Sequence, residues 1–203
     1  MSKAIRQLID DFFGTLKTFE NHRAIWLLGA ALAISLEVFS VLWFQNHLGL
    51  WPCEYCVIIR FDVLMVAAGC LLAAAWPRAL PVRLAGLLVA FFGAISGLVN
   101  TLKLEVITLK SQYIPGYYSI CRPGSVGFPL GLKPDKLFPL HFQALGICGE
   151  NQQWYLLGLS MTQWLIVVFL VMLTCLTLTL AALFVRRPAP KNFGGPGQIS
   201  TAH

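Results

Sequence analysis

Four apolar runs, each about as long as a lipid bilayer is thick, limit what this chain can fold into. They cover residues 24–44, 57–76, 82–102 and 158–185. An α-helix rises about 1.5 Å per residue, so roughly 20 residues cross the ~30 Å hydrocarbon core. Each run is longer than the apolar part of a cleaved secretory signal, so we expect the first run to be kept. The sequence therefore predicts an all-α membrane protein, a four-transmembrane-helix bundle.

The composition agrees with a membrane protein and excludes several soluble classes. Of the 203 residues, 57% are hydrophobic and only 12% are Asp, Glu, Lys or Arg. Soluble domains carry about 25% charged residues, so this chain lacks the polar surface that a water-soluble globule needs. The formal net charge of +6 is spread between the apolar runs and forms no basic stripe. These features exclude an ordinary cytosolic enzyme, a disordered chain and a nucleic-acid-binding domain.

The positions of Lys and Arg predict the orientation, because positive charge beside a span is retained in the cytoplasm. Residues 1–23 and 186–203 carry several basic residues, and arginines accompany the short connection at 77–81. Loop 45–56 carries none. Loop 103–157 holds five, but charges far from a span end count for less. We therefore expect both termini in the cytoplasm and both of these loops on the outer side.

The two ends of the chain differ from the spans in pattern. Within residues 1–23, apolar residues recur at helical spacing between charged ones, which predicts an amphipathic helix on the cytoplasmic membrane surface. In residues 186–203, Pro, Gly and polar residues dominate, which predicts a disordered tail. Tryptophans are expected at the membrane interfaces: Trp43, Trp51, Trp154 and Trp164 on the outer side, and Trp26 and Trp76 on the inner side.

The six cysteines are too few for a disulfide scaffold, so each is interpreted by its position. Cys70 and Cys175 lie within spans and are interpreted as small packing residues. Four others share the outer side, where an oxidising compartment lets disulfides persist: Cys53 and Cys56 in a C-x-x-C motif before the second span, and Cys121 and Cys148 in the long loop.

A C-x-x-C motif at the start of a helix is a redox arrangement, because the free N–H groups and partial positive charge there favour a thiolate. Cys56 is the residue best placed to feel this effect. Arg60 follows one helical turn deeper on the same face, where its guanidinium could stabilise the Cys56 thiolate or a reduced acceptor in the lipid. The alternative for Arg60 is that its long side chain extends to the lipid headgroups.

The second cysteine pair allows more than one interpretation. The 26 residues between Cys121 and Cys148 are rich in Pro and Gly, so this segment could move a cysteine from one partner to another. A static structural disulfide is the alternative for this pair taken alone. The C-x-x-C motif in the same compartment favours exchange between the pairs. A four-cysteine zinc site is disfavoured because the second pair lacks ligand spacing, and no metal is expected.

Two acidic residues, Glu37 and Asp62, lie within spans at depths similar to that of Arg60. An intramembrane ion pair, such as Arg60 with Glu37, is the favoured interpretation, because charges inside a membrane usually find partners. Proton uptake for an acceptor is the alternative.

Several motifs occur together in a fixed order: Trp26-Leu27-Leu28, Leu36-Glu37, Leu42-Trp43-Phe44-Gln45, Pro52-Cys53-x-x-Cys56, Arg60, Cys121, Pro134-Asp135-Lys136, Cys148 and Leu157-Gly158-Leu159-x-Met161-x-Gln163-Trp164-Leu165. Their order and spacing resemble the bacterial disulfide bond formation protein B family (DsbB), including its dedicated paralogue DsbI. The resemblance extends from about Trp26 to Phe169. It implies a protein-disulfide-generating quinone reductase of the inner membrane, with a transmembrane redox domain over residues 24–185 and both outer loops in the periplasm.

The resemblance also implies partners and roles. The protein would reoxidise a periplasmic thioredoxin-fold dithiol oxidase of the DsbA or DsbL type and pass the electrons to ubiquinone or menaquinone. Carried over by motif, Cys121 would accept the partner's thiolate, and Cys148 would then exchange with Cys53. Cys56, left as a thiolate beside Arg60, would reduce the bound quinone. The implied redox disulfides are Cys53–Cys56 and Cys121–Cys148.

One departure from the family concerns a His near the outer end of the third span, which in some members is linked to quinone binding. Residues 97–118 contain no His, and Glu105 and Thr108 are the candidates to replace it. In the long loop, a short interfacial helix within residues 134–146 is expected to act as an anchor. Its apolar side chains would touch the membrane: Leu137, Phe138, Leu140 and Phe142.

Two other functions stay open. A vitamin K epoxide reductase-like enzyme also joins loop cysteines and a C-x-x-C motif to a quinone, but there the motif lies at a later span. A non-catalytic membrane scaffold would use the same four cysteines as two structural disulfides.

Overall fold

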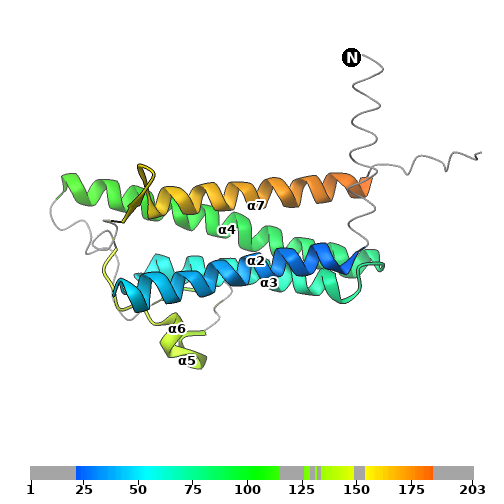
Figure 1. Cartoon of the computed structure of the whole chain (residues 1–203), viewed down its shortest axis with the longest axis horizontal. Coiled ribbons are helices and arrows are strands. Elements are labelled where there is room, and N and C mark those ends of the chain that lie inside the picture. Colours follow the sequence, from blue (N-terminus) through cyan, green and yellow to red (C-terminus); the bar gives the residue numbers. More distant parts are fainter. Residues whose placement is uncertain (1–21, 115–125, 129–130, 132–133, 149–153, 185–203) are drawn as a thin grey trace, which may run out of the picture.

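The computed structural model describes residues 22–114, 126–128, 131, 134–148 and 154–184. Its four long helices run side by side as a bundle (Figure 1): α2 (Arg23–Phe39), continued by the π-helix η1 (Ser40–His47), α3 (Glu54–Ala75), α4 (Leu80–Tyr113) and α7 (Met161–Phe184). All four are long and apolar enough to cross a membrane. The predicted four-helix membrane fold is therefore confirmed. The amphipathic helix and the tail predicted at the two chain ends lie outside the described residues.

The third span is longer than predicted. Helix α4 continues to Tyr113 instead of ending at residue 102. Its extension is joined to the start of α7, because the Glu105 carboxylate accepts hydrogen bonds from the Thr162 hydroxyl and, at 3.2 Å, from the Gln163 amide. Glu105, a candidate replacement for the family His, thus holds two helices together.

The fourth span begins later than predicted, because a small hairpin precedes it. Strand β1 (Tyr155–Leu156) pairs antiparallel with β2 (Leu159–Ser160). Leu157 and Gly158 form the turn with φ of 53° and 82°. A right-handed helix cannot include two such residues, so α7 starts at Met161.

Helix α3 packs against α2 and α4, and α4 packs in turn against α7. Small residues allow α3 and α4 to approach closely. A Cβ atom placed on Gly69 would lie 2.5 Å from the carbonyl oxygen of Gly86, so no side chain fits there. Close approach through small residues is a usual way to pack helices in a membrane, where burial from water does not drive association.

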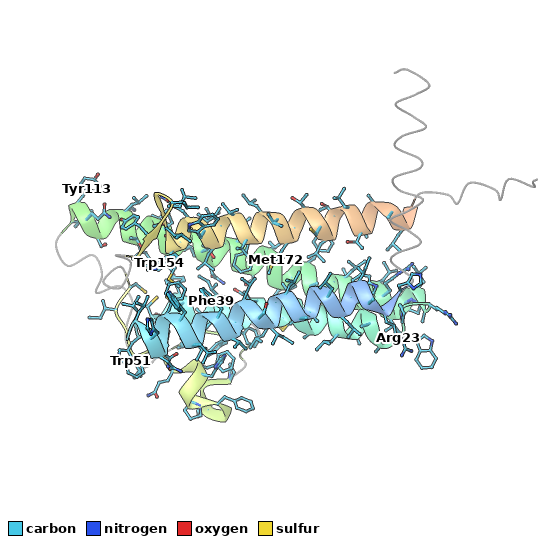
Figure 2. All side chains as sticks on the ribbon, viewed as in Figure 1. Arg23, Phe39, Trp51, Tyr113, Trp154 and Met172 are labelled. Carbon is cyan, nitrogen blue, oxygen red and sulfur yellow. The ribbon has the colours of Figure 1, made fainter. Side chains whose placement is uncertain are left out.

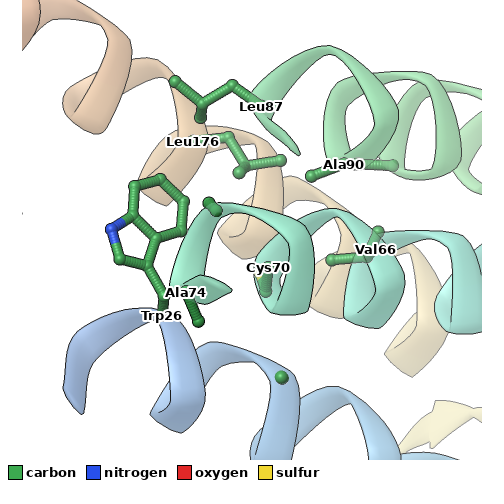
Figure 3. Close-up of a cluster of buried hydrophobic side chains, with 10 residues drawn as sticks. Trp26, Val66, Cys70, Ala74, Leu87, Ala90 and Leu176 are labelled. Carbon is green, nitrogen blue, oxygen red and sulfur yellow. The ribbon is translucent and has the colours of Figure 1, made fainter. Parts of the chain in front are cut away.

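One end of the bundle is a dense core, called the packed end below (Figure 3). All four long helices contribute buried side chains to it, including Trp26, Val66, Cys70, Ala73, Leu87, Ala90 and Leu176. Trp26 is only 3% exposed, so it faces this core instead of the lipid interface. Cys70 packs here as predicted. Cys175 is exposed on α7, so the prediction that it is a packing residue is wrong.

A buried polar cluster also joins α3 to α4. Asp62 is fully buried, and its Oδ2 accepts a 2.9 Å hydrogen bond from the Asn100 amide. The same amide donates to the Ser96 hydroxyl at 3.2 Å. Asp62 therefore takes neutral partners from α4, whereas Arg60 on the same helix pairs elsewhere.

Two short helices represent the predicted interfacial helix: α5 (Pro134–Leu137) and α6 (Pro139–Phe142). Pro139 separates them, because proline cannot donate the main-chain hydrogen bond that would continue α5. Figure 1 shows both beside one end of the bundle, next to the start of α3.

Candidate functional site

The C-x-x-C motif begins helix α3. Cys53 is the N-cap residue, with extended backbone, and its Sγ accepts a 3.3 Å hydrogen bond from the Cys56 N–H. The two sulfur atoms are 2.7 Å apart and share a hydrogen bond. The two cysteines are therefore close enough to interchange between a dithiol and a disulfide. The predicted Cys53–Cys56 disulfide belongs to the oxidised pair and stays a prediction.

The two thiols are not equivalent. The hydrogen bond with Cys56, together with burial, raises the pKa of the Cys53 thiol well above its ordinary value. A thiol with a raised pKa keeps its proton at neutral pH. Cys53 is therefore the member of the pair that holds its proton.

Main-chain hydrogen bonds fasten the long loop to this motif. The carbonyl oxygen of Pro52, directly before Cys53, accepts hydrogen bonds from the N–H groups of Leu145 and Gly146, each at 3.0 Å. We call this arrangement the loop clamp. Because it uses only backbone atoms, it fixes the loop beside the thiol pair whatever the side chains are.

The loop clamp brings a third cysteine to the pair. Cys148 is fully buried and disulfide-bonded. It packs in the same apolar cluster as Cys53 and Cys56. Three of the four predicted redox cysteines thus lie together. Cys121, and with it the predicted Cys121–Cys148 pairing, lies outside the described residues.

An apolar pocket of about 250 Å³ adjoins the thiol pair, with walls from α2, η1, α3 and α7. Cys53, Cys56, Arg60 and Glu37 line it together with aromatic side chains: Phe39, Phe44, Trp51, Trp154 and Trp164. Figure 2 shows Trp51 and Trp154 at one end of the bundle and Arg23 at the other. We call the end with the two cysteines and the pocket the thiol end. Three tryptophans expected at the outer interface therefore form part of a pocket wall.

Arg60 is held in this wall by protein groups. Its Nε lies 3.7 Å from Oε1 of Glu37, and its Nη1 donates a 3.1 Å hydrogen bond to the side-chain oxygen of Gln45. Its side chain is 8% exposed, so it stays inside the bundle. The predicted ion pair with Glu37 is confirmed. Gln45 belongs to η1, a type of helix often found at functional sites.

A histidine that sequence reasoning did not single out completes this group. His141 of α6 places its Nε2 2.9 Å from the same Oε1 of Glu37. No spacing in the sequence indicates this contact, because it joins residues far apart in the chain through the fold of the long loop. Gln45 offered a signal, since it stands in a motif shared with the DsbB family, but that motif assigned it no role.

The loop helices also pack on α3 through aromatic rings. Phe142 meets Phe61 edge to face, with ring centroids 6.4 Å apart, and is buried. The expectation that Phe142 touches the membrane is therefore wrong. Phe138 is 64% exposed and has the surface position expected of a membrane-facing side chain. The side chains of Leu137 and Leu140 lie outside those described.

Together, these features define a class: multi-pass membrane proteins with a C-x-x-C thiol pair, a disulfide-bonded loop cysteine and an apolar pocket at one end of a helix bundle. The family model described as "Disulfide bond formation protein DsbB" matches residues 22–179. The chain belongs to this family, as its motifs predicted.

Individual relatives agree with this assignment. The chain is 36% identical to disulfide bond formation protein B of Pasteurella multocida over 178 residues, 86% of this chain and 94% of that protein. It is 34% identical to the Escherichia coli protein of the same name over 148 residues, 73% and 80% of the two chains. It is also 32% identical to the putative protein-disulfide oxidoreductase DsbI of Campylobacter fetus, over 72% and 68% of the two chains. The chain is therefore a multi-pass bacterial inner-membrane protein of disulfide bond formation.

Proposed function

We propose that this protein is a protein-dithiol:quinone oxidoreductase. It reoxidises a periplasmic thioredoxin-fold dithiol oxidase of the DsbA or DsbL type and passes the electrons to ubiquinone or menaquinone. The observation that carries the proposal is the pocket at the thiol end, because both cysteines of the C-x-x-C motif line a single apolar cavity. The distribution of basic residues supports a periplasmic thiol end and cytoplasmic termini.

The pocket fits the ring of a quinone. Its volume is about 250 Å³, whereas a cavity of about 150 Å³ is enough to bind benzene. Leu36 and Phe39 line the pocket and are 39% and 50% exposed on a membrane-spanning helix, so its rim borders the lipid. A lipid-soluble acceptor can therefore enter from the bilayer.

The charged residues of the pocket fit the same group. A bound quinone supplies a two-electron acceptor next to the thiols. The guanidinium of Arg60 keeps its positive charge at any working pH, so it can stabilise negative charge that develops in the pocket or on Cys56. The aromatic wall would hold the ring and keep water from the sulfur atoms.

The cysteines support a sequence of exchanges. The partner's thiolate attacks Cys121 of the Cys121–Cys148 disulfide, which forms a mixed disulfide and releases Cys148 as a thiolate. Cys148 then bonds to Cys53 and releases Cys56 as a thiolate. The partner's second thiol resolves the mixed disulfide. The freed Cys121 thiolate then attacks Cys148 in the Cys148–Cys53 bond. This restores the Cys121–Cys148 disulfide and leaves Cys53 and Cys56 reduced. In this scheme a disulfide-bonded Cys148 beside a reduced Cys53 and Cys56 is the state that precedes electron transfer.

An anaerobic assay tests the proposal. Purified protein in detergent is mixed with a reduced thioredoxin-fold periplasmic oxidase and a short-chain ubiquinone or menaquinone, and the quinone absorbance is followed. We expect quinone reduction that is lost when Ser replaces any one of Cys53, Cys56, Cys121 or Cys148. Cys175→Ser is the matched control and should keep the parent rate, because this cysteine is exposed on α7. No reduction with either quinone class would overturn the proposal.

A further inference from the structure

Glu37 is the one acidic group among the described residues that line the pocket, and two basic groups face it from other helices. Arg60 of α3 approaches its Oε1 to 3.7 Å and His141 of α6 to 2.9 Å. Glu37 itself is 5% exposed. Both basic groups therefore converge on the same oxygen of one buried carboxylate.

The proposed reaction needs a proton that the thiol pair does not supply. Closing the disulfide from a Cys53 thiol and a Cys56 thiolate forms one S–S bond and releases two electrons and one proton. Reducing a quinone to a quinol consumes two electrons and two protons. One further proton must therefore enter a pocket that is apolar and bordered by lipid.

Among the described residues around Glu37, one can exchange that proton with water. Arg60 stays protonated, and Gln45, which contacts Arg60, is neutral at any working pH. Cys53 and Cys56 already contribute their proton to the balance above. Asp62 lies on α3 but is bonded to Asn100 on α4. His141 remains, with a side chain that is 32% exposed. An imidazole ring can accept a proton on one nitrogen and donate one from the other, which a relay requires.

We propose that Glu37 and His141 form a proton relay into the pocket. His141 takes a proton from the aqueous side and passes it to Glu37, and Glu37 delivers it to the reduced acceptor. The electrons come from the Cys53–Cys56 pair, and the proton that completes the balance comes from water. This inference rests on the proposed quinone reduction. The third span lacks the His that some family members carry there, and the relay instead uses His141 of the long loop.

The pH profile of two matched variants tests the relay. His141→Gln removes the exchangeable proton. His47→Gln makes the same change on the exposed end of η1, where His47 contacts the Trp43 ring and does not line the pocket. Reduced protein is mixed with a short-chain ubiquinone in single-turnover mode from about pH 5.5 to pH 9. The parent rate is divided by the variant rate at each pH. The pH dependence of the thiols is the same in both proteins, so it drops out of this ratio.

For His141→Gln we expect a ratio of at least about tenfold near pH 6 that decreases as the pH rises, because only the protonated imidazole donates. For His47→Gln we expect a ratio near one at every pH. A loss in His141→Gln that is the same at every pH would mean a structural role and would overturn the relay. A ratio near one at every pH for His141→Gln would also overturn the relay.

A second readout uses protein without any quinone. The infrared band of the Glu37 carboxyl, assigned with Glu37→Gln, is followed against pH in the parent and in His141→Gln. The relay predicts that the pH at which this band changes moves when His141 is replaced; an identical titration would overturn it. A parent that binds its partner but reduces no quinone would overturn the proposed function, whereas an active parent with a pH-independent ratio overturns the relay alone.

Discussion

The packed end and the thiol end are built from the same four helices but differ in how closely those helices pack. At the packed end, Gly69 and Gly86 bring α3 and α4 into contact, and Trp26 fills the remaining space. At the thiol end, the helices leave a pocket of about 250 Å³ and place a buried ion pair in its wall. Apolar helix faces are common to both ends. Substitutions at the thiol end are therefore expected to change quinone reduction. Substitutions at the packed end are expected to change the free energy of unfolding.

Cys56→Ser should have the largest effect on activity with little effect on stability. We expect quinone reduction to fall to background, because a serine hydroxyl cannot close a disulfide. The free energy of unfolding should fall by only about 1 kcal/mol, since serine has nearly the volume of cysteine and leaves the surrounding cluster in place. Quinone absorbance and detergent unfolding of the same sample measure the two effects. A large loss of stability with no parent activity to lose would favour the scaffold function instead.

Arg60→Ala should have the next largest effect. Removing a preorganised charge from a site where negative charge develops costs on the order of 100-fold in rate. We expect that loss in quinone reduction, whereas formation of the mixed disulfide at Cys121 should stay within about twofold. Arg60→Lys, which keeps the charge without the planar fork, should recover part of the rate. Stopped-flow measurement of both steps checks this, and equal quinone kinetics in Arg60→Ala and parent would remove Arg60 from the acceptor site.

At the packed end, Gly69→Ala is expected to lower stability and leave activity unchanged. A methyl group there would meet the Gly86 carbonyl oxygen and the Ala90 backbone nitrogen at 2.5 and 2.6 Å, so the helices must separate. Overpacking of this kind typically costs about 1–3 kcal/mol. Unfolding in a denaturing detergent should show that loss, with activity per folded molecule unchanged. Leu88→Ala on the same helix pair, at a site 71% exposed, is the control and should leave stability nearly as in the parent. Lost activity at full stability would show that the two ends are coupled.

The smallest effect concerns the titration of Cys53. Its hydrogen bond with Cys56 and its burial raise the pKa of this thiol, so its thiolate forms only at a pH above the ordinary thiol range. Cys56→Ala removes the hydrogen bond and leaves the burial. The pH midpoint of Cys53 alkylation by iodoacetamide should therefore move down, and mass spectrometry of the peptide measures it. Comparing midpoints instead of rates excludes altered access as the cause. An unchanged midpoint would mean that burial alone sets the pKa.

The sequence predicts the bundle well because each span carries its own signal. Twenty apolar residues define a membrane helix whatever its neighbours are. The ends of the helices are less predictable. The charged residues Lys103 and Glu105 suggested that the third span had ended, yet Glu105 finds partners on α7 and the helix continues. The turn at Leu157 and Gly158 depends on positive backbone angles that an apolar run does not reveal.

The site was predictable only in part, for a related reason. The C-x-x-C motif and Arg60 lie on one helix turn, so their proximity follows from local geometry. The ion pair with Glu37 could be expected because a charge inside a membrane needs a partner. His141 could not, because it reaches Glu37 only through the folded loop. Phe142 was misplaced for the same reason, since its partner Phe61 is on α3 and no sequence pattern links the two.

The loop clamp has a consequence for how this protein can evolve. The Pro52 carbonyl oxygen accepts from the N–H groups of Leu145 and Gly146, and every residue except proline offers an N–H group. Side chains around this point can therefore change without releasing Cys148 from its place beside the thiol pair. Substitutions in the loop can adapt the protein to a new partner while the spacing of its sulfur atoms is inherited unchanged.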